Sequence, residues 1–268
     1  MADDQGRCWS GGDAGDGRLG RGGASEMALV EGIDQCKGVA AGACHSLAFT
    51  SKGTLYAWGL ASDGRLGFAT EDASAPPTRV ALEGVVDASA GKYHSLVVAS
   101  EGVVFAFGDN SYGQLGLGST EDAWEPACVA LASSALCVAA GASHSLVLLE
   151  DGDVLGFGSD AQGQLGGARV DDESDSDSSD TDSTSSSSSS SAANDEVWRP
   201  ARVPGLCGKG VVAVAAGGAA NSDAGHTVAV TAAGVVLCLG AGGLGQLGAG
   251  VDSSSTPLPV PVRKTAWS

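Results

Sequence analysis

The four histidines have the greatest capacity for acid–base chemistry in this sequence, and each is followed by a hydroxyl side chain. His45, His94 and His144 precede serine, and His226 precedes Thr227. A His–Ser pair contributes to nucleophilic catalysis when a third group orients the imidazole. All four histidines occupy one position of an internal repeat, however, and a structural role explains that recurrence better. We expect each imidazole to bridge backbone groups at a turn. We predict no catalytic residue and no metal site, since copies one repeat apart are poorly placed to share an ion.

Two glycine-rich stretches, 15–20 and 240–245, match the dinucleotide-binding fingerprint G-x-G-x-x-G. This fingerprint binds a pyrophosphate only where a strand leads into it and a helix follows. Both matches coincide with a turn of the repeat, and Pro257 and Pro259 prevent a helix after the second one. We therefore predict no nucleotide and no other cofactor.

Three elements recur in order along the chain. The first is Ala-Gly-x-x-His-Ser-Leu, at 41, 90 and 140, with a stretched copy over 216–228. The second is a strand that ends in an aromatic or aliphatic residue before glycine, as at Trp58, and the third is a turn that ends in Leu-Gly. The last glycines of the five turns are Gly20, Gly67, Gly116, Gly166 and Gly248, which lie 47, 49, 50 and 82 residues apart. Such a period indicates a repeat architecture, in which the histidines, Trp58 and the turn glycines are structural positions.

Each unit of about 50 residues contains four short strands, the content of one propeller blade. Runs such as 96–99 and 146–149 are apolar on both faces, as a sheet between two neighbouring sheets requires. We predict an all-β, propeller-like array of four-stranded blades, with about four complete units and a partial one. In the first complete unit the expected strands are 45–50, 54–58, 77–82 and 85–88.

These three elements together resemble the repeat of the regulator of chromosome condensation family, over roughly residues 9–262. The resemblance implies a propeller, which has seven blades in the founding member of the family. Members include the exchange factor for the small GTPase Ran, ubiquitin-ligase subunits, a plant ultraviolet-B receptor and a bacterial β-lactamase inhibitor. Seven blades need about 350 residues, so this chain is expected to be a short arc or part of a longer propeller.

One segment does not belong to the repeat. Residues 171–196 carry nine acidic and no basic side chains, and their removal shortens the longest spacing from 82 to 56 residues. We predict a disordered acidic insert here, within a single repeat domain over 7–268 that follows an N-terminal tail over 1–6. Ser174 and Ser179 each have an aspartate three residues later, which makes them candidate phosphorylation sites for acidophilic kinases.

The charge balance limits the possible partners. The chain has 14 basic and 32 acidic residues, a net charge of −18. This excludes direct binding to nucleic acid or an anionic membrane and favours basic proteins. No secretory signal is evident, and the seven cysteines are odd in number without a C-x-x-C motif. We predict a cytoplasmic or nuclear location.

The function predicted is therefore a non-enzymatic, regulatory module for protein–protein interaction. The alternative, which the family resemblance implies, is guanine-nucleotide exchange on a Ran-like small GTPase. The short chain and the absence of a segment resembling an ordered wedge count against exchange. Apolar residues of the terminal unit, such as Val228 and Val230, predict self-association through an open blade face.

Overall fold

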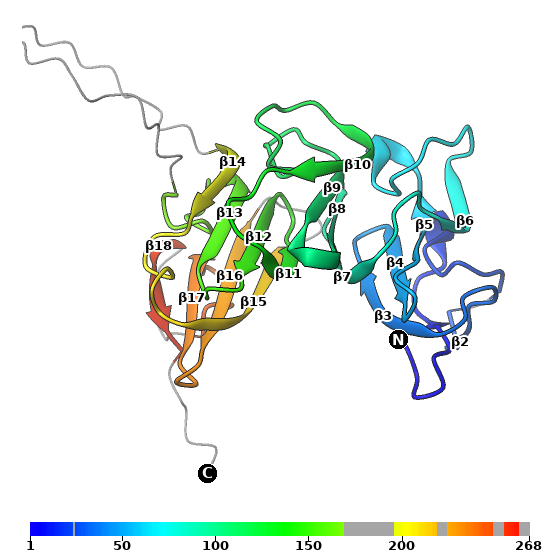
Figure 1. Ribbon diagram of the computed structural model, residues 1–268, viewed down its shortest axis with the longest axis horizontal. Helices are drawn as coiled ribbons and strands as arrows, with labels where there is room; N and C mark the ends of the chain where they lie inside the picture. The colour runs from blue at the N-terminus through cyan, green and yellow to red at the C-terminus, as the bar shows by residue number, and fades with distance from the viewer. Residues whose placement is uncertain (24, 169–195, 219–223, 249–254, 263–268) are drawn as a thin grey trace, which may run out of the picture.

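The computed structural model describes residues 1–23, 25–168, 196–218, 224–248 and 255–262, and these residues form short antiparallel strands and turns. Four sheets have four strands each, and in each sheet the strands pair in chain order. Each sheet is therefore one propeller blade, and the blades follow one another along an open arc (Figure 1). The prediction of four complete units and a partial one is confirmed.

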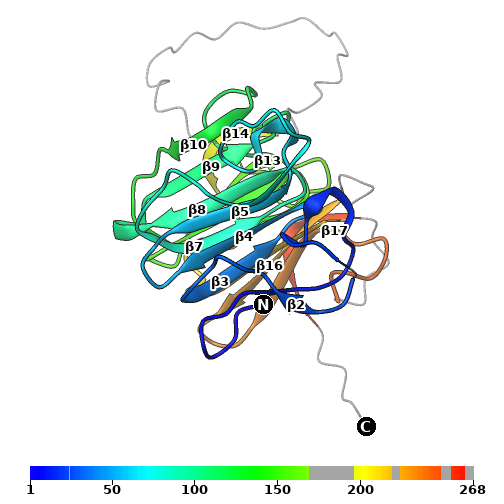
Figure 2. The same ribbon diagram turned by 90° about the vertical axis from the view of Figure 1, so that its right-hand side faces the viewer.

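Blades 1 and 2 come from the first half of the chain. Blade 1 consists of β3 (Cys36–Ala41), β4 (His45–Thr50), β5 (Leu55–Leu60) and β6 (Ser74–Arg79), and blade 2 of β7 (Val85–Ala90), β8 (His94–Ala99), β9 (Val104–Gly108) and β10 (Ala123–Val129). Figure 2 shows β3, β4 and β5 of blade 1 side by side.

Blades 3 and 4 continue the arc. Blade 3 consists of β11 (Ala135–Ala140), β12 (His144–Leu149), β13 (Val154–Ser159) and β14 (Glu196–Arg202), and blade 4 of β15 (Val211–Gly218), β16 (Gly225–Thr231), β17 (Val236–Ala241) and β18 (Ser255–Pro261). The first strands of successive blades contact one another along the inner side of the arc.

The partial unit precedes blade 1 and contributes a two-stranded sheet, β1 (Trp9–Ser10) with β2 (Ala28–Leu29). Residues 1–6, expected as a tail, fold back on this sheet. The Met1 ammonium donates to the Trp9 carbonyl at 2.6 Å, and the Trp9 N–H donates to the Met1 carbonyl at 2.8 Å. Within the described residues the helical elements are three short 3-10 turns: Gly15–Gly17, Ser62–Gly64 and Ser100–Gly102.

Apolar side chains fill the space between neighbouring blades. Between blades 1 and 2 the layer includes Leu47, Leu55, Val97 and Phe107, each with no exposed surface. The second strands of blades 2 and 3 are buried on both faces, since every residue of β8 and β12 is buried. Burial on both faces is the reason these strands lack an alternating polar pattern.

The last strand of each blade begins before its proline rather than at it. The strand expected over 77–82 runs from Ser74 to Arg79, and the other three last strands show the same shift. This strand lies at the outer edge of its sheet, where a proline that lacks an N–H does not interrupt pairing. Glu196, placed in the acidic insert by the sequence, is the first residue of β14. Residues 171–195, with Ser174 and Ser179, lie outside the described residues.

Candidate protein-interaction site

Three of the four repeated histidines, His45, His94 and His144, link their blade to the next one. Their partners are the hydroxyls that follow the histidine of the next blade, and not the turn backbone expected from the sequence. The Nε2–oxygen distances are 2.9 Å for His45 to Ser95 Oγ, 2.9 Å for His94 to Ser145 Oγ and 3.3 Å for His144 to Thr227 Oγ1.

The direction of these bonds decides what the pairs can do. The Ser145 hydroxyl donates to the Gln114 carbonyl at 2.6 Å, and the Ser95 hydroxyl donates to the Arg65 carbonyl at 2.8 Å. A hydroxyl has one proton to donate, so the imidazole Nε2–H must donate to the hydroxyl oxygen. A base that activates a serine needs the opposite polarity, in which the hydroxyl donates to the imidazole. The pairs therefore have the geometry of structural links between blades.

Burial keeps these imidazoles neutral. His45, His94 and His144 are at most 1% exposed, and burial lowers the pKa of His94 to about 4 and of the other two to about 3. The Ala-Gly pair of the repeat makes room for the ring, since a Cβ on Gly91 would lie 2.5 Å from His94 Cε1. The turn glycines Gly67, Gly116, Gly166 and Gly248 all have φ between +59° and +73°.

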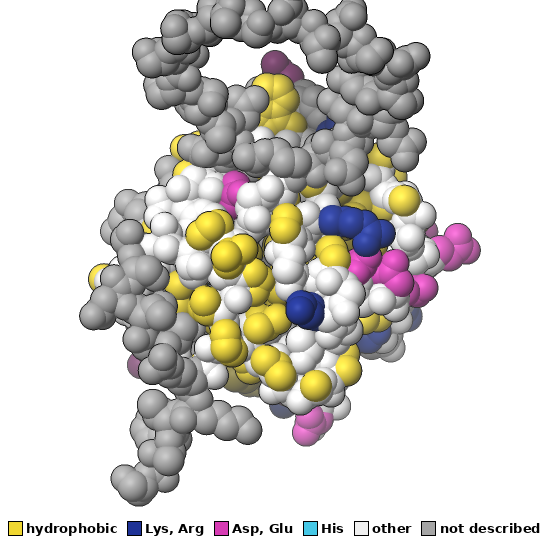
Figure 3. All heavy atoms as spheres, turned by 90° about the vertical axis from the view of Figure 1, so that its left-hand side faces the viewer, with side chains coloured by type: hydrophobic (Ala, Val, Ile, Leu, Met, Phe, Trp, Pro, Cys, Tyr) yellow, Lys and Arg dark blue, Asp and Glu magenta, His cyan; other side chains and the backbone are white. Residues whose placement is uncertain are grey.

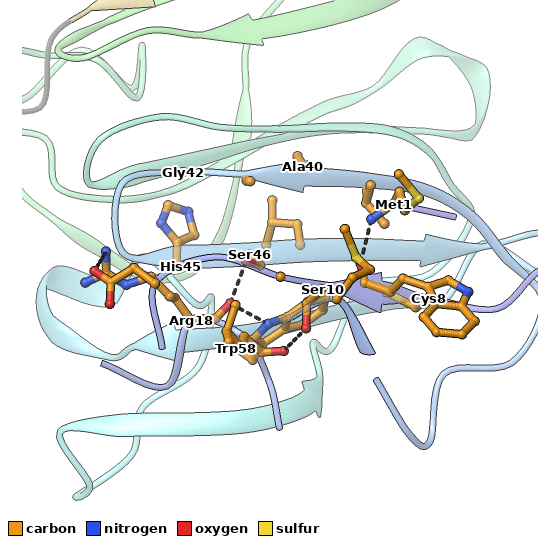
Figure 4. Close-up of a pocket in the computed structure, with 17 residues that line it drawn as sticks. Met1, Cys8, Ser10, Arg18, Ala40, Gly42, His45, Ser46 and Trp58 are labelled. Carbon is orange, nitrogen blue, oxygen red and sulfur yellow. Dashed lines mark hydrogen bonds and ion pairs between the residues drawn. The ribbon is translucent and has the colours of Figure 1, made fainter. Parts of the chain in front are cut away.

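A cavity of about 320 Å³ lies between the partial unit and blade 1 (Figure 4). Trp58 is 2% exposed at its wall and donates from Nε1 to the Arg18 carbonyl at 3.0 Å. Ser46 donates to the same carbonyl at 3.0 Å. In blades 2, 3 and 4 the hydroxyl at the position of Ser46 bonds to the imidazole of the preceding blade. Met1, Cys8 and Trp9 line the cavity on the side of the partial unit, and Val39, His45 and Trp58 line it on the side of blade 1.

The outer edge of blades 2 and 3 exposes two tryptophans at equivalent positions. Trp124 in β10 is 47% exposed and Trp198 in β14 is 46% exposed. Each lies against a turn glycine of the preceding blade: a Cβ on Gly64 would lie 2.8 Å from Trp124 Cα, and one on Gly113 would lie 2.5 Å from Trp198 Cδ1. Half-exposed tryptophan is a frequent anchor of protein–protein contacts.

Carboxylates lie near both tryptophans, and next to Trp198 they are accompanied by the exposed Arg199. The Trp198 Nε1–H donates to Glu196 Oε2 at 2.9 Å. Next to Trp124, partial burial raises the pKa of Asp122, and the negative charges of Asp109, Asp63 and Glu121 raise it further, against the hydrogen bond it accepts from Asn110. Between Lys92 and Arg169 the chain has nine acidic residues and no basic one. We name as the tryptophan rim the residues Trp124, Trp198, Asp109, Glu121, Asp122 and Glu196.

The tryptophan rim was not among the sites expected from the repeat pattern. Its available signal was the pattern Trp-x-Pro, at Trp124-Glu-Pro126 and Trp198-Arg-Pro200, which recurs in the last strand of two neighbouring units. The structure buries His45, His94 and His144 at blade interfaces, where each bonds to a hydroxyl and none is exposed for surface binding. In the described part of the chain, no group of three or more potential metal ligands converges, and no helix is long and apolar enough to cross a membrane.

Four stacked antiparallel blades with inter-blade histidine links define a protein of the propeller-repeat class. The sequence profile of the RCC1-like domain matches residues 1–268, and the chain belongs to this family. The human E3 ubiquitin-protein ligase HERC2 is 41% identical over 91 residues, and the mouse protein is 40% identical over 86 residues. These matches cover 31% and 30% of this chain, and the chain spans only 2% of each ligase.

Solved structures show the same fold. Human WBSCR16 matches with a TM-score of 0.75 at 24% identity, over 94% of this chain and 60% of that one. Yeast RCC1 (Prp20), solved with Kap60, matches with a TM-score of 0.69 at 19% identity, over 99% and 73%. Prp20p from Saccharomyces cerevisiae, described with its binding properties to Gsp1p and histones, gives 0.68 at 20% identity, over 99% and 75%. Known members of the family therefore include a protein described as binding Gsp1p and histones.

Proposed function

We propose that this chain is a non-enzymatic module that binds basic proteins, and that the tryptophan rim is its contact surface. The observation that carries the proposal is the pair of half-exposed tryptophans, Trp124 and Trp198, set among carboxylates one blade apart. An exposed indole face attracts a lysine or arginine side chain by a cation–π contact, and a neighbouring carboxylate can pair with the same cation.

The histone binding described for Prp20p supports a basic partner, as does the net charge of −18. Three further expectations from the sequence stay predictions. They are a cytoplasmic or nuclear location, phosphorylation of Ser174 and Ser179, and a regulatory role.

The test measures the affinity of a short, Lys- and Arg-rich peptide for the intact chain. The double variant Trp124→Ala, Trp198→Ala should bind at least about tenfold more weakly, since an anchor tryptophan contributes about 1–2 kcal/mol or more. Leu136→Ala is the matched control, because Leu136 is 55% exposed on β11 but lies outside the tryptophan rim. Equal affinity of the double variant and the parent chain would refute the proposal.

A second candidate is guanine-nucleotide exchange on a Ran-like GTPase. Two observations favour it: the family membership over the whole chain, and the Gsp1p binding described for Prp20p. Nucleotide release from a purified Ran-like GTPase, with and without this chain, tests it directly. Faster release that survives the Trp124→Ala, Trp198→Ala variant would place exchange on a different surface from the tryptophan rim.

A further inference from the structure

Two of the seven cysteines meet where the partial unit packs against blade 1. Cys8 immediately precedes β1 and Cys36 is the first residue of β3, and both belong to an apolar cluster that also includes Val30 and Trp58. Cys8 is 1% exposed and Cys36 is 5% exposed, and both are free thiols. Their side chains are hydrogen-bonded to one another. The fold thus brings together two sulfur atoms that are 28 residues apart in the sequence.

Backbone contacts hold the two cysteines in place. The Cys36 N–H donates to the Gly6 carbonyl at 2.8 Å, and the Val30 N–H donates to the Cys8 carbonyl at 2.8 Å. A Cβ on Gly6 would lie 2.9 Å from the Gln35 Cα, so the chain just before Cys8 runs directly against the start of β3. The contact between the two thiols is therefore fixed by the folded backbone.

The hydrogen bonds of the two thiols give them different chemical roles. The Cys36 thiol donates to the Gly38 carbonyl, with the sulfur and the oxygen 3.5 Å apart, so the proton between the two sulfur atoms comes from Cys8. This bond stabilises the thiolate form of Cys36 and lowers its pKa to about 7, although burial acts in the opposite direction. The same bond and burial raise the pKa of Cys8. Near neutral pH, Cys36 is therefore partly a thiolate nucleophile in contact with a protonated thiol.

The surroundings of the pair restrict which oxidant can reach it. Cys8 lies in the wall of the cavity between the partial unit and blade 1, as do Ser10 and Trp58 (Figure 4). Because neither cysteine is more than 5% exposed, a bulky disulfide such as oxidised glutathione cannot approach the sulfur atoms. Hydrogen peroxide is close to a water molecule in size, and it oxidises thiolates. The site therefore favours a small peroxide.

We propose that Cys8 and Cys36 form a reversible redox site that hydrogen peroxide oxidises to a disulfide. The Cys36 thiolate attacks one peroxide oxygen, the O–O bond breaks, hydroxide leaves, and Cys36 becomes a sulfenic acid. The Cys8 sulfur then attacks the Cys36 sulfur to form the S–S bond, and the Cys8 proton leaves with the sulfenic hydroxyl as water. The two thiols lose two electrons, which reduce the peroxide. A thiol reductant such as glutathione restores both thiols by exchange.

The disulfide changes how the partial unit is attached. It closes a loop over residues 8–36, which contains β1, β2 and the first 3-10 turn, and it joins the partial unit covalently to blade 1. A cross-link that restricts the unfolded chain stabilises the folded one, so oxidation should raise the melting temperature. The pair lies beside β1 and β3 at one end of the arc, whereas the tryptophan rim belongs to blades 2 and 3 (Figure 1). The redox site is therefore independent of the proposed function.

Mass spectrometry of the intact chain after peroxide treatment tests the proposal. Once the remaining free thiols are alkylated, trypsin places each cysteine in a peptide without another one, 8–18 for Cys8 and 22–37 for Cys36. The folded chain should give these two peptides joined by a disulfide, and dithiothreitol should separate them. Oxidation of the chain in urea should instead distribute cross-links over all seven cysteines.

Variants assign the role of each sulfur. Cys8→Ser should abolish the linked peptides and leave a sulfenic acid on Cys36 that dimedone traps. In Cys36→Ser, Cys8 should stay unlabelled, because burial keeps it protonated. Cys238→Ala is the matched control. Cys238 is 2% exposed on β17 of blade 4, at the end of the arc that faces the viewer in Figure 3, and its loss should leave the linked peptides unchanged.

The pH dependence of the reaction provides a second readout. The rate of disulfide formation should rise with pH and reach half its maximum near pH 7, where Cys36 ionises. An unperturbed cysteine would place this midpoint near pH 8.5.

Two results would overturn the proposal. One is a treated chain in which Cys8 and Cys36 stay reduced, or in which Cys36 is oxidised to sulfenic or sulfinic acid without linked peptides. The other is a yield of linked peptides in urea equal to that of the folded chain, because the fold would then not direct the bond. Neither result depends on whether the tryptophan rim binds a basic peptide.

Discussion

His94 connects blade 2 to blade 3 through one buried hydrogen bond, and its removal leaves the Ser145 hydroxyl oxygen without this donor. We expect His94→Ala to lower the free energy of unfolding by about 1–3 kcal/mol, the cost of an unpaired buried group. His226→Ala is the control, since that ring is only partly buried and, among the described residues, bonds to no hydroxyl of another blade. Urea denaturation of both variants measures the difference. Equal losses would show that the inter-blade bond contributes nothing.

The same histidines make stability depend on pH. Burial holds the pKa of His45 and His144 at about 3 and of His94 at about 4, whereas histidine in an unfolded chain titrates near 6.5. Below about pH 6.5 the unfolded chain binds protons that the folded chain excludes, so stability is complete above this pH and falls towards pH 4. Each histidine contributes about 1.4 kcal/mol per pH unit.

Urea denaturation at pH 7 and at pH 5 checks this expectation. His94→Gln retains a polar side chain but cannot titrate, so the variant should lose less stability between these two pH values than the parent. A parent chain as stable at pH 5 as at pH 7 would show that the imidazoles accept protons in the folded state.

At the scale of the element, the turn that ends in Leu-Gly sets how closely two blades approach. Gly64 has a φ of +74°, and a Cβ there would lie 2.6 Å from the Ala123 carbonyl oxygen of blade 2. Gly234, in the hairpin of blade 4, has a φ of +75° but meets nothing within 4 Å. Alanine costs about 1–2 kcal/mol at either position through its backbone conformation.

Gly64→Ala should therefore destabilise the chain by about 1–3 kcal/mol more than Gly234→Ala, since it also displaces the neighbouring strand. Because the displaced strand includes Trp124, Gly64→Ala should also weaken binding of the basic peptide. Thermal unfolding and the peptide affinity of the two variants test this pair of effects. Identical losses of stability in the two variants would mean that β10 shifts away from the added methyl group at no cost in free energy.

The blades could be predicted from the sequence because each unit repeats the same glycines, histidines and apolar runs. Contacts between units were harder to predict. The Nε2 of His45 bonds to Ser95, 50 residues later, and only the stacking of the blades brings these two side chains together. Trp124 also contacts a neighbouring blade, since a Cβ on Gly64 of blade 1 would lie 2.8 Å from its Cα. The local sequence pattern does not show which residues of different blades come into contact.

At the scale of the whole molecule, charge and shape act together. Between Lys92 and Arg169 the chain has nine acidic residues and no lysine or arginine, and Arg202 of β14 pairs with one of them, Asp153. This excess of negative charge is the reason we propose a basic partner for the tryptophan rim. In the sequence, the acidic segment 171–195 stands between β13 and β14 and ends three residues before Trp198 of the tryptophan rim.

This attachment predicts that the acidic segment strengthens the rim by long-range attraction. Deletion of residues 173–195 removes six carboxylates and leaves thirteen residues between β13 and β14, as many as join β5 to β6. The melting temperature should hardly change, since loop length affects stability only weakly. The affinity for the basic peptide should fall at low salt and match that of the parent at 1 M salt, because the screening length shrinks from about 10 Å at 0.1 M to about 3 Å. Phosphate on Ser174 or Ser179 would add about −1.5 to −2 charges each and steepen the salt dependence of the parent. Peptide titrations over a range of salt concentrations test this prediction. If the segment is only a spacer, its deletion will leave the salt dependence of peptide binding unchanged.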